Sequence, residues 1–422
     1  MSPRTTRLLS VGAVAVLSVG LAACSTPAAT TPSASAPAST TASAAAATDG
    51  AAPVSNGAAQ VAISLTNDGT DKCTLDYTSA AAGPITFTVT NVSSTAITEI
   101  ELQSDLKIVG EKENLAPGLP ASSFTVTLDG GTYKVYCPGA DPESQDFTVT
   151  GTAAEAPSGT TAQLLKQGAS DYAAWVVAQA EEMQTAVGTL KSAIDSGDLD
   201  AAKAAYVKAR PFYEKIESDV EGFVLDGFKV DDNSGNLDYL IDMRASSLDP
   251  KVGWSGFHAI ERDLYKSGEI TAKTKKYASD LVTNVGKLVT LVKGLTYKPE
   301  DLANGAASLL EEVQANKITG EEESYSHIDL VDFAYNVEGA KQAFANLQPG
   351  LEKIDADLTD QVATQFAAVD TALDAYRDSS APGGYISWTK ENRTKYAKGL
   401  SQAVLALQQP LQKIAEKVAT AK

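Results

Sequence analysis

The spacing of apolar residues changes between residues 150 and 160, and this change restricts the chain to folds with two unlike parts. Apolar and polar residues alternate with a period of two in residues 61–65, 85–90, 124–128 and 132–136. From residue 161 onward, apolar residues instead recur three or four positions apart. Alternation indicates strands with one buried face, and the wider spacing indicates amphipathic helices. We therefore expect a β domain over residues 60–150, a linker over 151–160 and a helical domain over 161–422.

The β region has the composition and turn signals of an all-β sandwich. Val, Ile, Thr and aromatic residues dominate its alternating segments, and Asn, Asp, Pro and Gly residues lie between them. Short strands at this spacing, over about ninety residues, are typical of a sandwich. Its arrangement resembles a cupredoxin domain, with Cys73 early and Cys137 directly after the segment that ends at Tyr136.

The cysteines and acidic residues of this region leave several chemistries open. A blue-copper centre needs one Cys and two His, usually with an axial Met, but residues 60–150 contain no His and no Met. In an exported protein, Cys73 and Cys137 indicate a disulfide first, with a thiolate-containing metal site as the alternative. Further along, a set of glutamates could bind a hard cation or could form a solvated face. These are Glu99, Glu101, Glu111 and Glu113.

The N-terminal residues have the features of a lipoprotein signal peptide. Arg4 and Arg7 precede an apolar run that is too short to span a bilayer, and the sequence Leu-Ala-Ala-Cys ends at Cys24. This ending resembles a lipobox, so residues 1–23 would be removed and Cys24 would carry the lipid; a secreted protein with a chance cysteine is the alternative. Residues 24–59 are mostly Ala, Ser, Thr and Pro, and we expect a flexible tether. The protein would then lie outside the cytoplasm, on the membrane of the cell envelope or periplasm.

The net charge excludes some partners. Lys and Arg number 34 against 53 Asp and Glu, which gives −19. Removing Arg4 and Arg7 with residues 1–23 leaves about −21. Such a surface disfavours nucleic acid and suits cations, although acidity also keeps an exported protein soluble.

The helical region is expected to be a bundle, because the connections between its periodic segments are short. One long helix over 164–195 should end at Gly197, and Asp198 should cap the next, which runs over 199–223 with Pro211 as a kink. Another helix should follow Asp249 and Pro250. Further helices are expected over 270–294, 299–318, 327–347, 350–379 and 389–420.

One of the two histidines of the chain has a carboxylate at helical spacing. His258 and Glu261 are three residues apart, so on a helix they are neighbours and can face one cation. A second acidic pair at the same spacing, Glu214 and Glu217, and the nearby Asp242 could complete an oxygen-rich site. One imidazole with several carboxylates suits iron or zinc better than Cu(I), and a single such pair predicts one metal ion. Surface ion pairs at this spacing are common, so the pair alone is a weak motif.

The other histidine follows a run of acids. His327 lies after Glu323, and Ser326 with Asp329 resembles a capping box that would place His327 at a helix N-terminus. We weigh three roles for His327: a structural hydrogen bond, contact with the metal or substrate, and a pH-sensitive lid. Glu323 could act beside it, either as part of the lid or in indirect contact with the metal.

Several runs together resemble the EfeO/EfeM family of bacterial iron-uptake proteins. They are residues 213–217 (YEKIE), 254–261 (WSGFHAIE), 317–322 (KITGEE), 325–327 (YSH) and, in the first domain, 112–118 (KENLAPG). The resemblance covers both domains and implies a cupredoxin-like domain followed by an imelysin-like one. It implies a metal site at His258 and Glu261, with carboxylates from Glu214 or Glu217 and from Asp242. Acids expected after Arg244 are replaced by residues 245–247 (ASS), so the resemblance does not supply an additional ligand there.

The function that the resemblance implies is transport rather than catalysis. The protein would capture Fe(II) or Fe(III), with zinc or copper as other cargoes, and deliver it to a membrane permease alongside a haem-peroxidase-like partner. Two other classes compete with this. A metal-dependent peptidase or a ferroxidase would be an enzyme, but the chain has no His-Glu-x-x-His motif and no histidine in the first domain. An adhesion module would leave the acids around His258 without a role.

Overall fold

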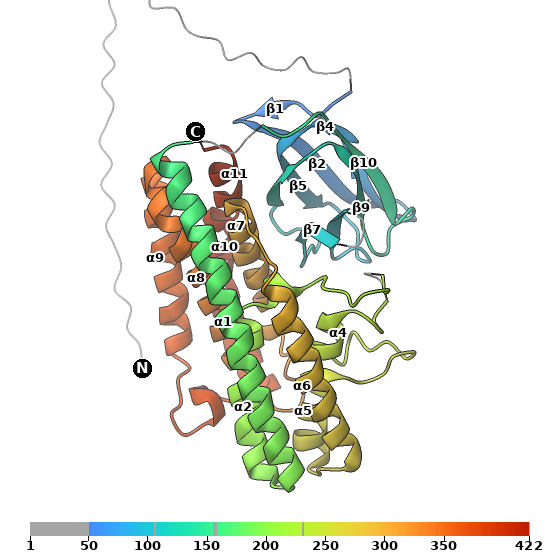
Figure 1. Ribbon diagram of the computed structural model, residues 1–422, viewed down its shortest axis with the longest axis vertical. Coiled ribbons are helices and arrows are strands. Elements are labelled where there is room, and N and C mark those ends of the chain that lie inside the picture. Colours follow the sequence, from blue (N-terminus) through green and yellow to red (C-terminus); the bar gives the residue numbers. More distant parts are fainter. Residues whose placement is uncertain (1–49, 105–106, 155–157, 230–231, 422) are drawn as a thin grey trace, which may run out of the picture. The chain divides into compact units, whose positions relative to one another are not determined.

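The computed structural model describes residues 50–104, 107–154, 158–229 and 232–421 (Figure 1). Strands make up the first part of the described chain and helices the remainder, as the two spacings of apolar residues predict. Buried apolar side chains form two separate clusters, one among the strands and one among the helices. None of the described helices is both long and apolar enough to cross a membrane. Cys24 and the predicted signal peptide lie outside the described residues.

One sheet of the β part contains five strands. Four of them follow the order β1-β2-β5-β8, and the fifth, β3, pairs with residues 63–67 of β2. β2 and β5 run parallel, and the other pairs are antiparallel. The strands are β1 (Val54–Ser55), β2 (Ala58–Asn67), β3 (Asp71–Leu75), β5 (Gly83–Asn91) and β8 (Ser122–Leu128).

The second sheet has the order β4-β10-β9-β6-β7, with β4 and β10 parallel. Its strands are β4 (Ser79–Ala81), β6 (Ile100–Ser104), β7 (Lys107–Lys112), β9 (Gly131–Tyr136) and β10 (Ser144–Thr150). Phe87 of the first sheet packs against Phe147 of the second, with ring centroids 5.2 Å apart. The alternating residues therefore meet between two sheets, and the predicted all-β sandwich is confirmed.

The sandwich begins earlier than the sequence predicts. The composition of residues 54–59 predicts a tether, but Val54 and Ser55 form β1, and β2 begins at Ala58. Ala58 and Ala59 are buried. Alanines do not show a clear alternation of apolar and polar side chains, which is why the start of this strand was missed.

Cys73 of β3 and Cys137 after β9 form a disulfide. The predicted pairing is thus present, and neither sulfur is a thiolate that could bind a metal ion. We expect a digest of the alkylated, unreduced protein to contain the two peptides joined through these cysteines. Separate peptides with both cysteines alkylated, read by mass spectrometry, would contradict the bond.

The helical part is built around long helices that pack side by side. α1 (Thr160–Ser196) packs against α2 (Leu199–Glu214), α6 (Ala272–Val292) and α8 (Asp329–Ile354). The remaining long helices are α7 (Pro299–Glu312), α9 (Ala356–Asp374) and α10 (Lys390–Leu411). Short elements connect them: α3 (Glu217–Val220), α4 (Leu237–Asp242), α5 (Gly256–Glu261), α11 (Ile414–Ala419), the π-helices η1 (Arg262–Ser267) and η2 (Val313–Lys317), and the 3-10 helix η3 (Pro382–Gly384).

The turn from α1 to α2 follows the sequence signals. Gly197 adopts the left-handed conformation at the end of α1, and the Asp198 side chain accepts a hydrogen bond from the backbone N–H of Ala201. These are a glycine C-cap and an aspartate N-cap, which stop one helix and start the next.

α2 ends sooner than predicted, at Glu214 rather than near Phe223. Pro211 lies inside it, and the chain turns at Ile216 before α3 begins. The backbone carbonyl of Glu214, at the end of α2, accepts a hydrogen bond from the Asn336 side chain of α8 at 2.8 Å. The break separates Glu214 and Glu217, which a continuous helix would place on one face.

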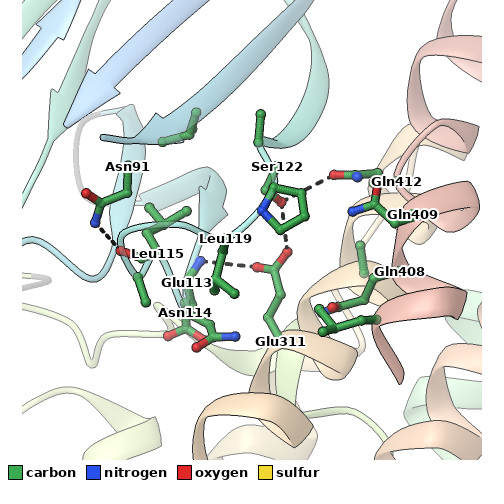
Figure 2. A pocket seen from close by; sticks show the side chains of 16 residues that line it. Asn91, Glu113, Asn114, Leu115, Leu119, Ser122, Glu311, Gln408, Gln409 and Gln412 are labelled. Atoms are coloured by element: carbon green, nitrogen blue, oxygen red, sulfur yellow. Dashed lines mark hydrogen bonds between the residues drawn. The ribbon is translucent and has the colours of Figure 1, made fainter. Parts of the chain in front are cut away.

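Charged and polar side chains join the strands to the helices. Lys112 of β7 is buried and donates to Glu311 of α7 at 2.8 Å. Glu311 also accepts from the backbone N–H of Glu113 at 3.1 Å and from the Ser122 hydroxyl at 3.4 Å (Figure 2). Thr86 donates to Glu416 of α11 at 3.0 Å.

Candidate metal centre

The segment that carries His258 is a short helix with a buried face. α5 begins at Gly256, whose φ of 66° lies in the left-handed region, and continues into the π-helix η1. Phe257, Ile260 and Leu264 are fully buried. The predicted apolar stripe thus holds α5 in the core, and it carries His258 and Glu261 inward with it.

Both ring nitrogens of His258 face carboxylates. Nδ1 lies 3.1 Å from Oε2 of Glu261, and Nε2 lies 3.2 Å from Oε1 of Glu322. Nε2 is also 3.6 Å from Oδ1 of Asp242, the last residue of α4. His258 is 1% exposed, so these carboxylates take the place of water around the imidazole.

Glu261 is fixed by the loop that precedes α8. Its Oε1 accepts hydrogen bonds from the backbone N–H groups of Tyr325 and Ser326, both at 2.7 Å. Oε2 is left to face the imidazole. The predicted pairing of His258 with Glu261 is therefore present, and the backbone of a distant segment orients its carboxylate.

The structure adds Glu322, which is not among the site residues expected from the sequence. It lies within a run of three glutamates, residues 321–323, where a charge run normally indicates an exposed face. Glu322 and Glu323 are instead buried, at 1% and 0% exposure. The available signal was the position of this run within a segment that resembles the EfeO/EfeM family.

Glu323 lies closer to His258 than the predicted role in a lid or in indirect contact with the metal would require. Ligand atoms of His258, Glu261 and Glu323 lie within 4.8 Å of one another, and those of Asp242, His258 and Glu322 do so as well. The Tyr206 hydroxyl donates to Glu323 at 2.8 Å. The imidazole thus belongs to two groups that could each hold a cation.

Three buried or half-buried cationic side chains form ion pairs with the carboxylates. Arg210 of α2 and Lys317 of η2 are fully buried, and Arg244 is partly so. Arg210 contacts Glu214, Asp242, Glu322, Glu323 and Asp332. Lys317 contacts Glu214, Glu217, Glu312 and Glu322, and Arg244 contacts Glu312, Glu321 and Glu322. This described network therefore contains more carboxyl groups than cationic groups.

Glu214 and Glu217 do not join His258 in the predicted way. Neither belongs to the two groups around the imidazole; Glu214 reaches them only through Arg210 and Lys317. Glu217 lies with Glu221 and Glu312 in a separate group. The two glutamates separate because α2 ends at Glu214 and Glu217 begins a new helix, α3. Asp242 does reach His258, as predicted.

The predicted capping box at Ser326 and Asp329 is absent. His327 has a φ of 59°, and α8 begins only at Asp329, without a side-chain cap. Asp329 instead accepts from the backbone N–H of Glu323 at 3.1 Å. The His327 carbonyl accepts a hydrogen bond from the backbone N–H of Trp388 at 2.8 Å. This bond holds the loop that carries Glu322 and Glu323 against the segment before α10.

Burial and neighbouring charges move the titration of these groups in opposite directions. Burial lowers the pKa of His258, but Asp242, Glu261 and Glu322 raise it well above its ordinary value. Burial raises the pKa of Glu323 to about 7. Burial also raises the pKa of Glu322, but Lys317 and Arg244 lower it to well below its usual range. The carboxylates around one imidazole therefore differ greatly in how tightly they hold a proton.

The glutamates predicted in the β part do not form a solvated face. Glu101 is 8% exposed, and the Gln103 amide donates to it at 2.6 Å. Glu111 and Glu113 lie against carboxyl groups of the helical part, Glu221 and Glu312 respectively. The sequence could not show this, because their neighbours lie more than a hundred positions away.

Comparison with known proteins agrees with this fold. A family model described as imelysin, of the peptidase M75 type, matches residues 168–414, which is more than half of the chain. The chain therefore belongs to the imelysin family. Curated relatives extend the match to the β part: "Iron uptake system component EfeO" of Escherichia coli O1:K1 is 34% identical over 339 residues, covering 79% of this chain and 86% of its own. The protein of the same name from Shigella flexneri is 33% identical with the same coverage.

These relatives place the chain in the EfeO/EfeM family, as the sequence motifs predicted. Their names describe components of iron uptake and not enzymes, in agreement with the expected non-enzymatic role. Two solved structures are similar to a smaller extent. A putative iron-regulated protein A precursor from Parabacteroides distasonis has 15% identity and a TM-score of 0.47, over 63% of this chain and 97% of its own. Reduced rusticyanin has 13% identity and a TM-score of 0.19, over 23% and 82%.

Proposed function

We propose that the protein is the extracytoplasmic iron-binding component of an uptake system and that His258 lies at the centre of its cargo site. The observation that carries this proposal is the placement of a buried imidazole between two pairs of carboxylates, Asp242 with Glu322 and Glu261 with Glu323. The relatives' function in iron uptake supports iron as the cargo. Imidazole and carboxylate ligands suit Fe(II), Fe(III) or zinc far better than Cu(I).

One imidazole binds one cation in this arrangement. A neutral histidine offers a lone pair on one ring nitrogen and a proton on the other, and a carboxylate usually orients the protonated side. Here each nitrogen of His258 has a carboxylate within 3.2 Å. Whichever nitrogen receives the cargo, the opposite carboxylate can accept the remaining N–H and fix the ring.

The internal cations make reversible capture possible. Arg210 contacts Asp242, Glu322 and Glu323, so an incoming metal ion competes with a guanidinium that is already present. The carboxylates are thereby held in position before cargo arrives, and the gain on binding is reduced. A transport component needs both properties, because it must bind its cargo and then release it.

The surroundings of the protein are part of the same proposal. Cys24 would carry a lipid, and the residues between Cys24 and the β-sandwich would tether the folded part to the membrane, where a permease would receive the iron and a haem-peroxidase-like protein would assist. The β-sandwich would be cupredoxin-like in its fold, but without blue-copper chemistry, since His and Met are missing from residues 60–150.

Replacing His258 with alanine tests the cargo site. We expect the affinity for Fe(II), measured anaerobically by calorimetry on the purified protein, to fall at least about 100-fold, because even residues that only orient a ligand are worth 10- to 100-fold. His327→Ala is the matched control, since His327 is outside both groups, and it should bind iron as the wild type does. Comparison of Glu261→Gln with Glu322→Gln identifies the nitrogen that binds, because the larger loss marks the side of the cargo.

Unchanged iron affinity in His258→Ala would overturn the assignment of this site. Peptide hydrolysis by the iron- or zinc-loaded wild type that disappears in His258→Ala would instead favour the peptidase alternative. Oxidation of Fe(II) at a rate that depends on His258 would favour a ferroxidase.

A further inference from the structure

A second group of carboxylates lies apart from the imidazole. Glu217 of α3, Glu221 directly after α3 and Glu312 at the end of α7 each place a carboxylate oxygen within 4.8 Å of the other two. Glu217 and Glu312 are both 2% exposed. This group contains oxygen ligands alone, which is the set that hard cations prefer.

The β-sandwich brings two more carboxylates to this group. The carboxyl of Glu113 lies against that of Glu312, and the carboxyl of Glu111 lies against that of Glu221. Two ionised carboxylates in contact repel each other unless a proton or a cation lies between them. The two halves of the chain therefore meet through acidic pairs in which a shared proton or a cation must separate the carboxylates.

Two oxygens of this group have no hydrogen-bond partner among the described residues. They are Oε2 of Glu113 and Oε2 of Glu221, and both are completely buried. A buried carboxylate oxygen without a donor is costly unless a proton or a cation reaches it. The neighbouring Glu311 shows the contrast, because Ser122 and the backbone N–H of Glu113 donate to its two oxygens (Figure 2). Lys112 donates to it as well.

An acidic cavity gives access to the group. A cavity of about 460 Å³ is lined by both Glu111 and Glu221, and its wall also carries Asp129, Asp219 and Asp301 together with one lysine, Lys298. A cleft in which one sign of charge predominates raises the local concentration of the opposite ion. Cations would therefore collect beside the two outer members of the group, Glu111 and Glu221.

The inner members of the group are joined to the His258 site. Lys317 contacts Glu217 at 3.3 Å, Glu312 at 3.4 Å and Glu322 at 3.1 Å. Arg244 contacts Glu312 at 3.1 Å and Glu322 at 3.2 Å. Both use Oε2 of Glu322, while Oε1 of the same residue faces His258. One carboxylate thus borders both groups.

We propose that Glu217, Glu221 and Glu312, completed by Glu111 and Glu113 of the β-sandwich, form a second cation site. It receives a hard cation from the acidic cavity and passes it through Glu322 to the His258 site. The transfer step rests on the proposed function of His258, whereas the second site itself does not. Its location also gives the β-sandwich a role, since the sandwich supplies two of the ligands.

The test first counts the cations that the protein binds. It then replaces Glu113 and Glu221, the two glutamates whose Oε2 atoms have no hydrogen-bond partner among the described residues. We titrate the wild type anaerobically with Fe(II) in a calorimeter and expect two binding events. A titration with Mn(II) should also show two events. Glu113→Gln combined with Glu221→Gln keeps the size of both side chains; it should remove one event and slow the loading of the His258 site at least about tenfold. Glu416→Gln, at a glutamate of α11 that also contacts the β-sandwich through Thr86 but lies outside the group, is the control and should keep both events.

The two proposals fail in different ways. A single event in the wild type, or two events that the double variant leaves unchanged, would overturn the second site whether or not His258 binds iron. Loss of the same event in the double variant and in His258→Ala would do so as well. Loss of one event in the double variant, with none lost in His258→Ala, would preserve the second site and contradict the cargo site.

Discussion

Replacing Arg210 with methionine is expected to lower the free energy of unfolding by about 3 to 5 kcal/mol, the usual cost of leaving buried charges without their partner. The guanidinium is fully buried, and methionine removes its charge while keeping much of its length. It contacts five carboxylates, namely Glu214, Asp242, Glu322, Glu323 and Asp332. Without Arg210 these groups must either take up protons or repel one another.

Lys341→Met is the matched control for this substitution. Lys341 contacts Asp370 at 2.5 Å, but the two side chains are 50% and 41% exposed, so water can replace the lost contact. We expect its free energy of unfolding to change by at most about 1 kcal/mol. Urea denaturation of both variants without added metal measures the difference, and equally small changes would show that Arg210 does not balance the carboxylates.

A bound cation should reduce the cost of losing Arg210. A ligand that binds only the folded state stabilises it in proportion to the logarithm of its concentration over the dissociation constant. If iron occupies the His258 site, it supplies positive charge next to Asp242 and Glu322, two of the partners of Arg210. The protein would then use a built-in cation when empty and a metal cation when loaded.

Much of the fold follows from local signals in the sequence. The change in apolar spacing separated strands from helices, and Gly197 with Asp198 marked the end of one helix and the start of the next. The spacing of His258 and Glu261 predicted their contact correctly, because both lie on one short helix. These features depend on residues close to one another in the chain, where periodicity and capping act.

The remainder of the candidate site depends on contacts between distant segments. Glu322 reaches His258 from 64 positions away, and Arg210 reaches Glu322 across 112. A run of glutamates gives no local sign that it is buried, because burial of charge is decided by the partners that the fold supplies. Lys317 shows the same limit, since a lysine near the end of a helix would normally be expected at the surface.

Gly256 connects the backbone of the fold to the geometry of the site. Its φ of 66° is unfavourable for any residue with a side chain, and an added Cβ would lie 2.0 Å from the carbonyl oxygen of Ile241 and 3.0 Å from the backbone nitrogen of Asp242. The start of α5 and the end of α4 therefore touch at the point where Asp242 approaches His258. No residue larger than glycine fits without moving one of them.

Gly256→Ala is therefore expected to affect stability and metal binding together. The conformation alone costs about 1 to 2 kcal/mol, and displacement of the Ile241 backbone adds to it. Because the displaced segment carries Asp242, the Fe(II) affinity of the His258 site should also fall. Gly253→Ala separates the two causes, since Gly253 has a φ of 85° but no atom within 4 Å of an added Cβ. It should show the loss of stability from the backbone conformation and keep its iron affinity; equal affinities in both variants would mean that the contact at Ile241 does not position Asp242.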